Sequence, residues 1–296
     1  MRARLARLPY GRALGWALLI LLILVTLAPF YVMLRTAISG PGTLFQQARS
    51  LVPLEPTTVH FERVLGLLTP EENRAAGGSG AMINFAVAMR NTVLFTVIVV
   101  LGQVFFSAMA AYAFARMRFL GRTVLFYAYL SALMIPGIVL FIPNFILIRD
   151  LGWLNTFQGM VAPFVLMTPF AVFFLRQFFL GIPVSLEEAA KLDGASPFGT
   201  FWRIILPVSK TPLVTLGILT SIQAWNEFFW PFLVGRDPSV RVLTVALQSF
   251  QSSTPQGSPD WAGLMAATFL SVVPIFILMV VLGRQVISSL QFSGLK

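Results

Sequence analysis

Cysteine, histidine and charged residues are scarce in this 296-residue chain. It has no cysteine, which excludes disulfides, thiolate metal sites and cysteine nucleophiles. It has one histidine, His60, which excludes a histidine-centred metal or catalytic cluster. Only 11% of the residues are charged and 57% are apolar, whereas soluble domains carry about 25% charged and about 45–50% apolar residues. The chain therefore lacks the polar surface that a soluble, disordered or nucleic-acid-binding protein needs.

Six long apolar segments are the clearest positive feature, and Glu227 in the fifth is the only charged residue within them. A helix that crosses the hydrocarbon core of a bilayer needs about 20 predominantly apolar residues. The segments are residues 13–34, 91–115, 123–148, 151–175, 211–235 and 261–283. Prolines and glycines inside several of them predict kinked helices. We therefore predict an all-α, polytopic membrane protein with six transmembrane helices.

The arginines predict how these helices are oriented. Arg2, Arg4, Arg7 and Arg12 precede the first segment, and three more arginines lie between 116 and 122. If six spans alternate, both groups lie on one side, and the positive-inside rule assigns that side to the cytoplasm. We expect a multi-pass protein of the cytoplasmic (inner) membrane, in contact with membrane lipid, with both termini in the cytoplasm.

The sequence between the fourth and fifth segments predicts two short helices joined at a glycine corner. Ser185-Leu186-Glu187-Glu188 fits a capping box, with Ser185 as the N-cap and Glu188 reaching back to it. Gly194 is placed to end this helix in a left-handed conformation, and Ser196-Pro197 is typical of a second helix start.

Two interpretations of this loop are equally consistent with its residues. It could be an amphipathic hairpin on the lipid headgroups. It could also be a rigid knob that inserts into a partner protein. In that case the small side chains of Ala189 and Ala190 would let the partner approach closely, and the two acids beside them could meet its basic residues.

The loop also resembles a known motif. Glu188-Ala189-Ala190, Gly194, Ile204 and Leu206-Pro207 match, without a gap, the EAA loop of the permease subunits of ATP-binding-cassette (ABC) importers. Three further stretches resemble the carbohydrate (maltose-type, binding-protein-dependent) branch of these permeases: Arg90-Asn91-Thr92, Ala111–Arg116 and Ala224–Pro231. The resemblance implies a bacterial or archaeal membrane.

The resemblance implies three parts for the chain. They are a cytoplasmic tail with the first transmembrane helix (residues 1–35), an extracytoplasmic loop (36–83), and a permease core (84–290) that contains a cytoplasmic coupling loop (181–208). Together they would form half of a translocation pathway for a sugar or related solute, which works by alternating access. The residues that would couple to the ATPase are Glu187, Glu188, Ala189, Ala190, Asp193, Gly194, Ile204, Leu206 and Pro207.

The resemblance also implies partners. They are a second, homologous permease subunit in a heterodimer, a cytoplasmic ATPase dimer and an extracytoplasmic solute-binding protein. We expect no nucleic-acid partner. The chain has no G-x-x-x-x-G-K-[ST] run. We therefore expect a non-catalytic subunit that binds no cofactor or metal, with ATP and Mg²⁺ on the partner ATPase.

Glu227 is the one ionisable residue inside a predicted span. Placing a charged side chain in the bilayer costs free energy, so such a residue indicates a functional site. Its neighbours Gln223, Trp225 and Asn226 combine aromatic and amide groups, which suit a sugar or an interfacial aromatic belt. We predict that these four residues belong to a substrate pathway or gate, and we favour a gate or packing role for Glu227 over direct solute contact. The alternative function is an ion-coupled secondary transporter, for which Glu227 is the only available intramembrane ion carrier.

Overall fold

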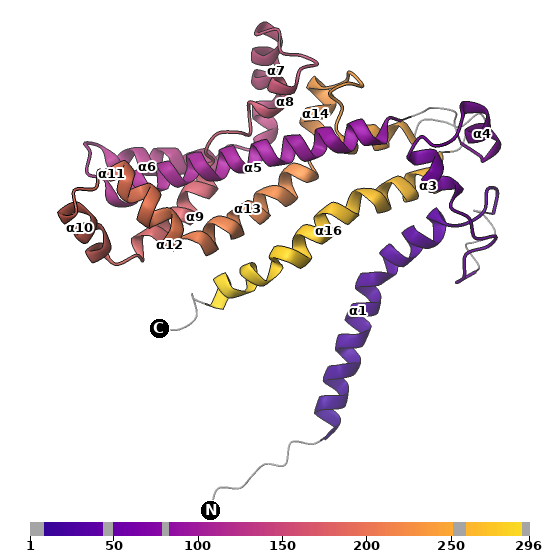
Figure 1. The fold of residues 1–296 in the computed structure, drawn as a ribbon, viewed down its shortest axis with the longest axis horizontal. Helices are drawn as coiled ribbons and strands as arrows, with labels where there is room; N and C mark the ends of the chain where they lie inside the picture. The colour runs from indigo at the N-terminus through magenta and orange to yellow at the C-terminus, as the bar shows by residue number, and fades with distance from the viewer. Residues whose placement is uncertain (1–8, 44–49, 79–82, 251–258, 292–296) are drawn as a thin grey trace, which may run out of the picture. The chain divides into compact units, whose positions relative to one another are not determined.

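The structure, a computed structural model, describes residues 9–43, 50–78, 83–250 and 259–291. These residues form helices joined by turns and loops, and no strand occurs among them (Figure 1). The predicted all-α class is confirmed. The chain divides into two compact units, residues 1–83 with 247–272, and residues 84–246 with 273–296. The N-terminal arginines Arg2, Arg4 and Arg7 lie outside the described residues.

Unit 1 contains α1 (Pro9–Ala37), α3 (Val59–Val64), α4 (Pro70–Ala75) and the start of α16 (Trp261–Gln291). Most of the apolar side chains of α1 are exposed, as in a helix that lipid surrounds. Helix α4 begins with a capping box, in which Thr69 and Glu72 satisfy each other's backbone N–H groups.

A polar core in unit 1 is built around the buried side chain of Arg63. Its guanidinium donates to Asn73 Oδ1 at 3.0 Å and forms an ion pair with Asp260. It also lies 2.8 Å from His60 Nδ1. Because arginine can only donate, His60 Nδ1 accepts and its Nε2 carries the proton, which is donated to the Ser39 carbonyl at 2.8 Å.

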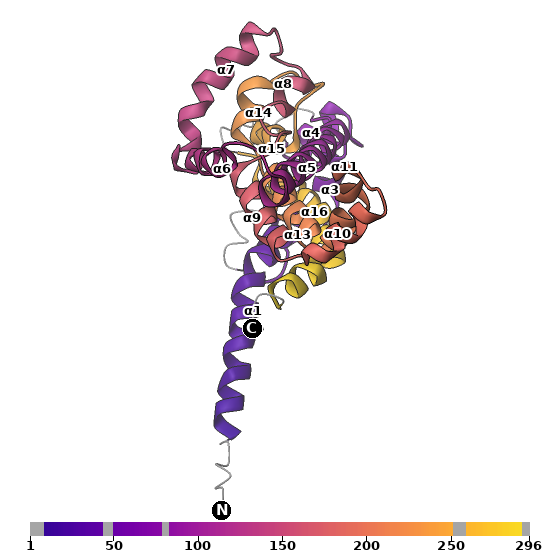
Figure 2. The same cartoon turned by 90° about the vertical axis from the view of Figure 1, so that its left-hand side faces the viewer.

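Unit 2 is organised around the long helix α5 (Phe85–Arg116), against which α9 (Pro169–Leu180) and α13 (Lys210–Trp225) lie (Figures 1 and 2). Ser107, Ala111 and Ala115 recur every four residues on α5 and are all buried, so they form a packing face of small residues. Gly102 lies so close to the loop before α9 that an added Cβ atom would come within 2.5 Å of the Val165 carbonyl oxygen.

The remaining helices of the described chain are short. They are α6 (Arg122–Ser131), η1 (Ala132–Met134), η2 (Gly137–Leu140), α7 (Phe141–Asp150), α8 (Phe157–Val161), α10 (Val184–Leu192), α11 (Pro197–Thr200), η3 (Phe201–Ile205), α12 (Leu206–Val208), α14 (Phe229–Val234), α15 (Leu243–Leu247) and η4 (Gln248–Phe250). Two apolar clusters fill unit 2: one joins α5, α9 and η3 around Phe179 and Phe201, and the other joins α5, α8 and α14 around Trp230.

Three of the predicted spans are single helices in the structure, and the other three are interrupted. The first, second and sixth coincide with single long apolar helices, α1, α5 and α16. The third is bent by 95° between Met134 and Gly137, where Pro136 interrupts the helix. The fourth and fifth are interrupted at residues 162–168 and 226–228. The predicted kinks are therefore present, while the count of six spans remains a prediction.

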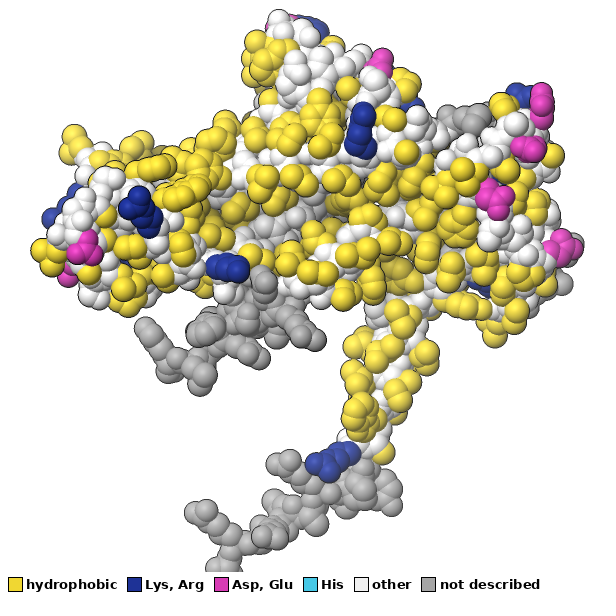
Figure 3. All heavy atoms as spheres, in the orientation of Figure 1, with side chains coloured by type: hydrophobic (Ala, Val, Ile, Leu, Met, Phe, Trp, Pro, Cys, Tyr) yellow, Lys and Arg dark blue, Asp and Glu magenta, His cyan; other side chains and the backbone are white. Residues whose placement is uncertain are grey.

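Charge and apolar surface separate within unit 2. Apolar side chains cover much of the length of α5, and acidic and basic side chains gather near α10 (Figure 3). Helix α10 carries Glu187, Glu188 and Lys191, and Asp193 follows it. So many charges do not suit the hydrocarbon core of a bilayer, which favours a position for α10 outside the membrane.

Candidate functional site

The loop between α9 and α13 has the predicted glycine corner. Gly194 has φ +79°, the left-handed conformation that glycine adopts without steric cost. The Ala195 N–H then donates to the Ala190 carbonyl at 2.9 Å, which closes the end of α10. Ser196 accepts from the Gly199 N–H at 3.1 Å and Pro197 begins α11. The predicted second helix start is confirmed.

The predicted capping box at the start of α10 is wrong. The N-cap is Pro183, Val184 is already helical, and no side chain caps the helix. Pro183 has φ −57° and ψ 129°, so it leads the chain into the helix two residues before Ser185. Ser185 and Glu188 therefore sit inside the helix, where they cannot satisfy the N-terminal N–H groups.

Helix α10 has one face turned into this chain and one face exposed. Glu187 is 6% exposed and Ala190 is 5% exposed. Glu188, Ala189, Lys191, Leu192, Asp193 and Gly194 are exposed. Of the two alanines and two acids, Ala189 and Glu188 are therefore exposed to a possible partner, whereas Ala190 and Glu187 are buried, and the coupling role of all four stays a prediction. The backbone of Glu187 and Ala190 belongs to the predicted loop, but their side chains contact this chain.

Glu187 faces two residues near the end of α5. Its Oε1 lies 3.1 Å from Arg116 Nε, and its Oε2 accepts from the Tyr112 hydroxyl at 3.5 Å. The Arg116 N–H does not point at the carboxylate, so the contact is an ion pair without an aligned hydrogen bond. This partnership was not predicted from the sequence, although Tyr112 and Arg116 both lie in the family-like stretch Ala111–Arg116.

The other predicted coupling residues follow the corner. Ile204 and Leu206 are half-buried and Pro207 is exposed. Between Thr200 and Leu206 the chain forms a π-helical turn, η3, and its residues Phe201 and Ile205 enter the core. Phe198 and Trp202 stack on each other at 6.3 Å between ring centroids, and both are exposed.

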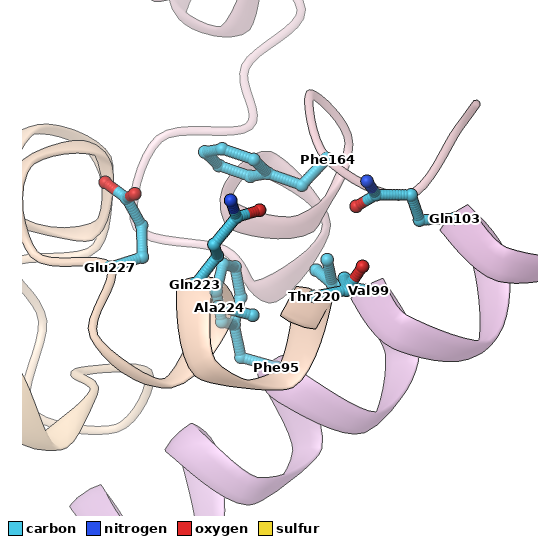
Figure 4. A pocket seen from close by; sticks show the side chains of 8 residues that line it. All are labelled: Phe95, Val99, Gln103, Phe164, Thr220, Gln223, Ala224 and Glu227. Carbon is cyan, nitrogen blue, oxygen red and sulfur yellow. The ribbon is translucent and has the colours of Figure 1, made fainter. Parts of the chain in front are cut away.

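A cavity of about 320 Å³ lies between α5 and α13. Its lining residues are Phe95, Val99, Gln103, Phe164, Thr220, Gln223, Ala224 and Glu227. Gln103 comes from α5, Gln223 from α13, and Glu227 from the turn that follows α13 (Figure 4). The Phe164 ring lies close to the Gln223 amide in that view.

The four predicted pathway residues do not share one site. Gln223 and Glu227 line this cavity, whereas Trp225 lines a separate apolar cavity of about 290 Å³. Asn226 lines neither, and its side-chain amide donates to the Ile222 carbonyl at 2.8 Å. Their different directions follow from the 100° step per residue of a helix.

Glu227 is fixed at the end of the cavity by contacts on both sides. Its Oε1 accepts from the Trp230 N–H at 3.1 Å, and its carbonyl accepts from Thr244 at 2.7 Å. The Trp230 indole in turn donates to the Gly159 carbonyl at 3.2 Å. The acid therefore has a packing role at the start of α14 and also faces the cavity.

Several cavity residues were missed by sequence reasoning. Phe95, Val99 and Gln103 recur every four residues on α5, and Thr220, Gln223 and Glu227 recur at helical spacing along and just beyond α13. This periodicity, with a glutamine in an otherwise apolar span, is the signal that could have indicated a shared face. Gln103 donates to Thr168 Oγ1 at 3.0 Å, which ties α5 to the start of α9.

The stretch Arg90-Asn91-Thr92 holds a distant segment. The Asn91 amide donates to the carbonyls of Ser239 and Arg241 at 2.9 and 3.1 Å. The Thr92 hydroxyl accepts from the Leu243 N–H at 2.7 Å. These residues therefore anchor the segment that precedes α15.

The family model for the binding-protein-dependent transport system inner membrane component matches residues 103–290, which include α10 and much of the cavity. The chain belongs to this family. It is thus a permease subunit of an ABC transporter and a multi-pass inner-membrane protein. This membership excludes the ion-coupled secondary transporter.

Relatives extend the match to nearly the whole chain. The probable ABC transporter permease protein YurM of Bacillus subtilis is 31% identical over 97% of this chain and 89% of its own length. The trehalose/maltose transport system permease protein MalG of Thermococcus litoralis is 31% identical over 94% of each chain. The arabinooligosaccharides permease protein AraQ of Halalkalibacterium halodurans is 35% identical over 70% of this chain and 72% of its own.

A solved structure agrees on the fold. A chain of a bacterial ABC transporter that imports the acidic polysaccharide alginate superimposes with a TM-score of 0.78 over 96% of this chain and 98% of its own, at 24% identity. The resemblance to carbohydrate-type permeases is confirmed by these relatives.

Proposed function

We propose that this permease forms half of the translocation pathway of a sugar importer, together with a second homologous permease subunit. A cytoplasmic ATPase dimer would bind ATP and Mg²⁺ and hydrolyse the ATP, and an extracytoplasmic binding protein would deliver the solute. The observation that carries the proposal is the two-faced helix α10, buried at Glu187 and exposed at Glu188, within a loop that matches the EAA motif.

The exposed face of α10 suits a protein partner. Ala189 offers a surface with little side-chain bulk, and Leu192, 90% exposed, offers an apolar contact at the end of the helix. Glu188 and Asp193 add negative charge. We infer that this face sits in a groove of the ATPase with basic residues at its rim, because charge complementarity guides such docking.

We infer that closure of the ATPases on ATP moves α10. This movement would change the side of the membrane to which the cavity between α5 and α13 is open, as alternating access requires. In this arrangement α10, both termini and the Arg116–Arg122 segment lie in the cytoplasm. The positive-inside rule supports that orientation.

We infer that the solute is an uncharged sugar or polyol. The cavity lining contains one carboxylate, two amides and a hydroxyl, and none of its eight residues is basic. An anionic solute such as a phosphate ester or uronate would meet Glu227 without a compensating cation, and an unpaired buried charge is costly. Hydroxyl groups could bond to Gln103, Gln223 and Glu227, while an apolar ring face could lie on Phe164.

The experiment is ATP-dependent uptake by the assembled transporter in liposomes. Radiolabelled neutral oligosaccharides, polyols and glycerol phosphate are offered with their binding proteins. Uptake that needs both the ATPase and ATP supports the importer, whereas uptake by this chain alone contradicts it. Transport of only the anionic solutes would contradict the solute class but leave the importer standing.

A further inference from the structure

The C-terminal residue of α5, Arg116, joins three elements at one point. Its Nε lies 3.1 Å from Glu187 of α10, and its Nη2 donates to the carbonyls of Phe179 and Ile182 at the end of α9 and in the turn beyond it. The side chains of Arg116 and Glu187 are 10% and 7% exposed. The guanidinium is thus a nearly buried link between α5, α9 and α10.

Tyr112 reinforces this link one helical turn earlier. Its hydroxyl lies 3.5 Å from the second oxygen of Glu187, and its ring lies 5.3 Å from that of Phe201, after the glycine corner. Residues 112 and 116 lie on the same face of α5. The inner face of the coupling loop is therefore held by two successive turns of α5.

A buried ion pair is weak evidence of stabilisation, because the desolvation of two charges offsets most of their attraction. Apolar side chains of similar size could fill the same space. The pair does provide a fixed connection between two elements 71 positions apart in sequence. Because Coulomb attraction does not require an aligned hydrogen bond, the contact can persist while α10 tilts.

Helix α5 leads from this link to the cavity. It is a single helix of 32 residues and carries Phe95, Val99 and Gln103 on its cavity face. Gln103 lies about 20 Å from Arg116 along the helix at 1.5 Å per residue. The backbone route from the coupling loop to α13 instead passes through a 78° bend between α12 and α13. The link through Arg116 therefore connects α10 to the cavity through the unbroken helix α5, whereas the backbone route is bent.

We propose that the Arg116–Glu187 pair transmits movement of α10 to α5 and so to the cavity, with Arg116 as a positioning residue of the coupling. This inference rests on the proposed docking of α10 to the ATPase. It assigns different tasks to adjacent acids: Glu188 contacts the ATPase, and Glu187 passes the movement into the membrane part of the same chain.

The test compares Glu187→Gln, Arg116→Met and their double variant in the fully assembled transporter. Gln is isosteric with Glu, and Met approximates the volume of Arg without its charge. We expect membrane insertion, ATPase pull-down and basal ATP hydrolysis at wild-type levels in Glu187→Gln and in the double variant, because neither leaves a buried carboxylate without its counter-ion. We expect solute-stimulated hydrolysis and uptake to fall at least about tenfold in each single variant, with little further loss in the double variant, because the two residues act as a unit.

A second comparison distinguishes a loss of coupling from a folding defect. Arg116→Lys keeps the positive charge and should recover part of the stimulation that Arg116→Met loses. Unchanged stimulation in Glu187→Gln, or equal loss in Arg116→Lys and Arg116→Met, overturns the proposal. So does loss of ATPase binding in Glu187→Gln. Failure of the docking itself is distinguished by Glu188→Lys, which would then retain full ATPase binding.

Discussion

Glu187 and Glu188 are adjacent in the sequence and differ in surroundings: Glu187 is buried beside Arg116, and Glu188 is exposed on α10. The helical step of 100° separates the two side chains. One acid of the motif is therefore available to a partner, and the other is engaged within the permease.

The exposed acid predicts a docking defect. Glu188→Lys should weaken pull-down of the ATPase about tenfold or more, because it reverses charge at the proposed contact. Membrane expression should stay unchanged, since the side chain is exposed. Glu71→Lys makes the same charge change on an exposed residue of unit 1 and is the matched control. If the wild type, Glu188→Lys and Glu71→Lys all pull down the ATPase equally, docking through Glu188 loses its support.

We predict that a side chain at position 194 strains the backbone. No neighbouring atom lies within 4 Å of a Cβ added there, so only its left-handed φ of +79° opposes substitution. Gly194→Val should cost about 1–2 kcal/mol, and Gly194→Asn should cost less, because asparagine tolerates this conformation. The measurement is ATPase pull-down together with the melting temperature of the purified permease. A Val variant as competent and stable as the Asn variant would argue against a strained corner.

His60 predicts a loss of stability in acid. Burial, and then the nearby Arg63 cation, lower the pKa of His60 below its ordinary 6.5, against the opposing effects of the Ser39 hydrogen bond and Asp260. The unfolded chain therefore takes up a proton at a higher pH than the folded one. Stability should be complete above pH 6.5 and should fall as the pH drops from there toward the lowered pKa.

The measurement is the melting temperature from about pH 7.5 to about pH 5, in wild type and in His60→Gln. Glutamine can still donate to the Ser39 carbonyl and accept from Arg63, but it does not titrate. The acid-dependent decrease should be smaller in the variant. An identical pH dependence in both proteins would show that other groups cause it.

Asn91 predicts a local structural defect. Asn91→Leu removes the amide that bonds the carbonyls of Ser239 and Arg241. Ser239 is exposed and Arg241 is half-buried, so each lost hydrogen bond should cost about 0.5–1.5 kcal/mol, the net value of an ordinary hydrogen bond. The melting temperature should fall, and proteolysis near residues 236–242 should accelerate. Leu94→Ala, at an exposed position on the same helix, is the control and should have little effect on either.

Local rules in the sequence predicted local features of the coupling loop. The left-handed Gly194 and the Ser196 cap depend on residues that are neighbours in the chain, and both are present. The capping box failed because the helix begins at Val184, before Ser185. A pattern of the S-x-x-E type does not fix where a helix starts when a proline upstream can lead into it.

Contacts between distant residues were beyond sequence reasoning. The pairing of Arg116 with Glu187, and the division of Gln223 and Trp225 between two cavities, depend on how α5 packs against α9 and α13. Apolar periodicity indicates that a helix has a buried face, but not which helix covers it. For the same reason Glu227 could be recognised as unusual, whereas its bond to Trp230 could not.

The most direct test of docking through α10 uses the absence of cysteine from the chain. Ala189→Cys and Ala190→Cys introduce single thiols at adjacent positions, one exposed and one 5% exposed. Maleimide labelling is measured for each variant with and without the ATPase. We predict rapid labelling of Ala189→Cys in the permease alone, strong protection in the complex, and slow labelling of Ala190→Cys in both. Labelling of Ala189→Cys at the same rate with and without the bound ATPase would contradict docking through this face of α10.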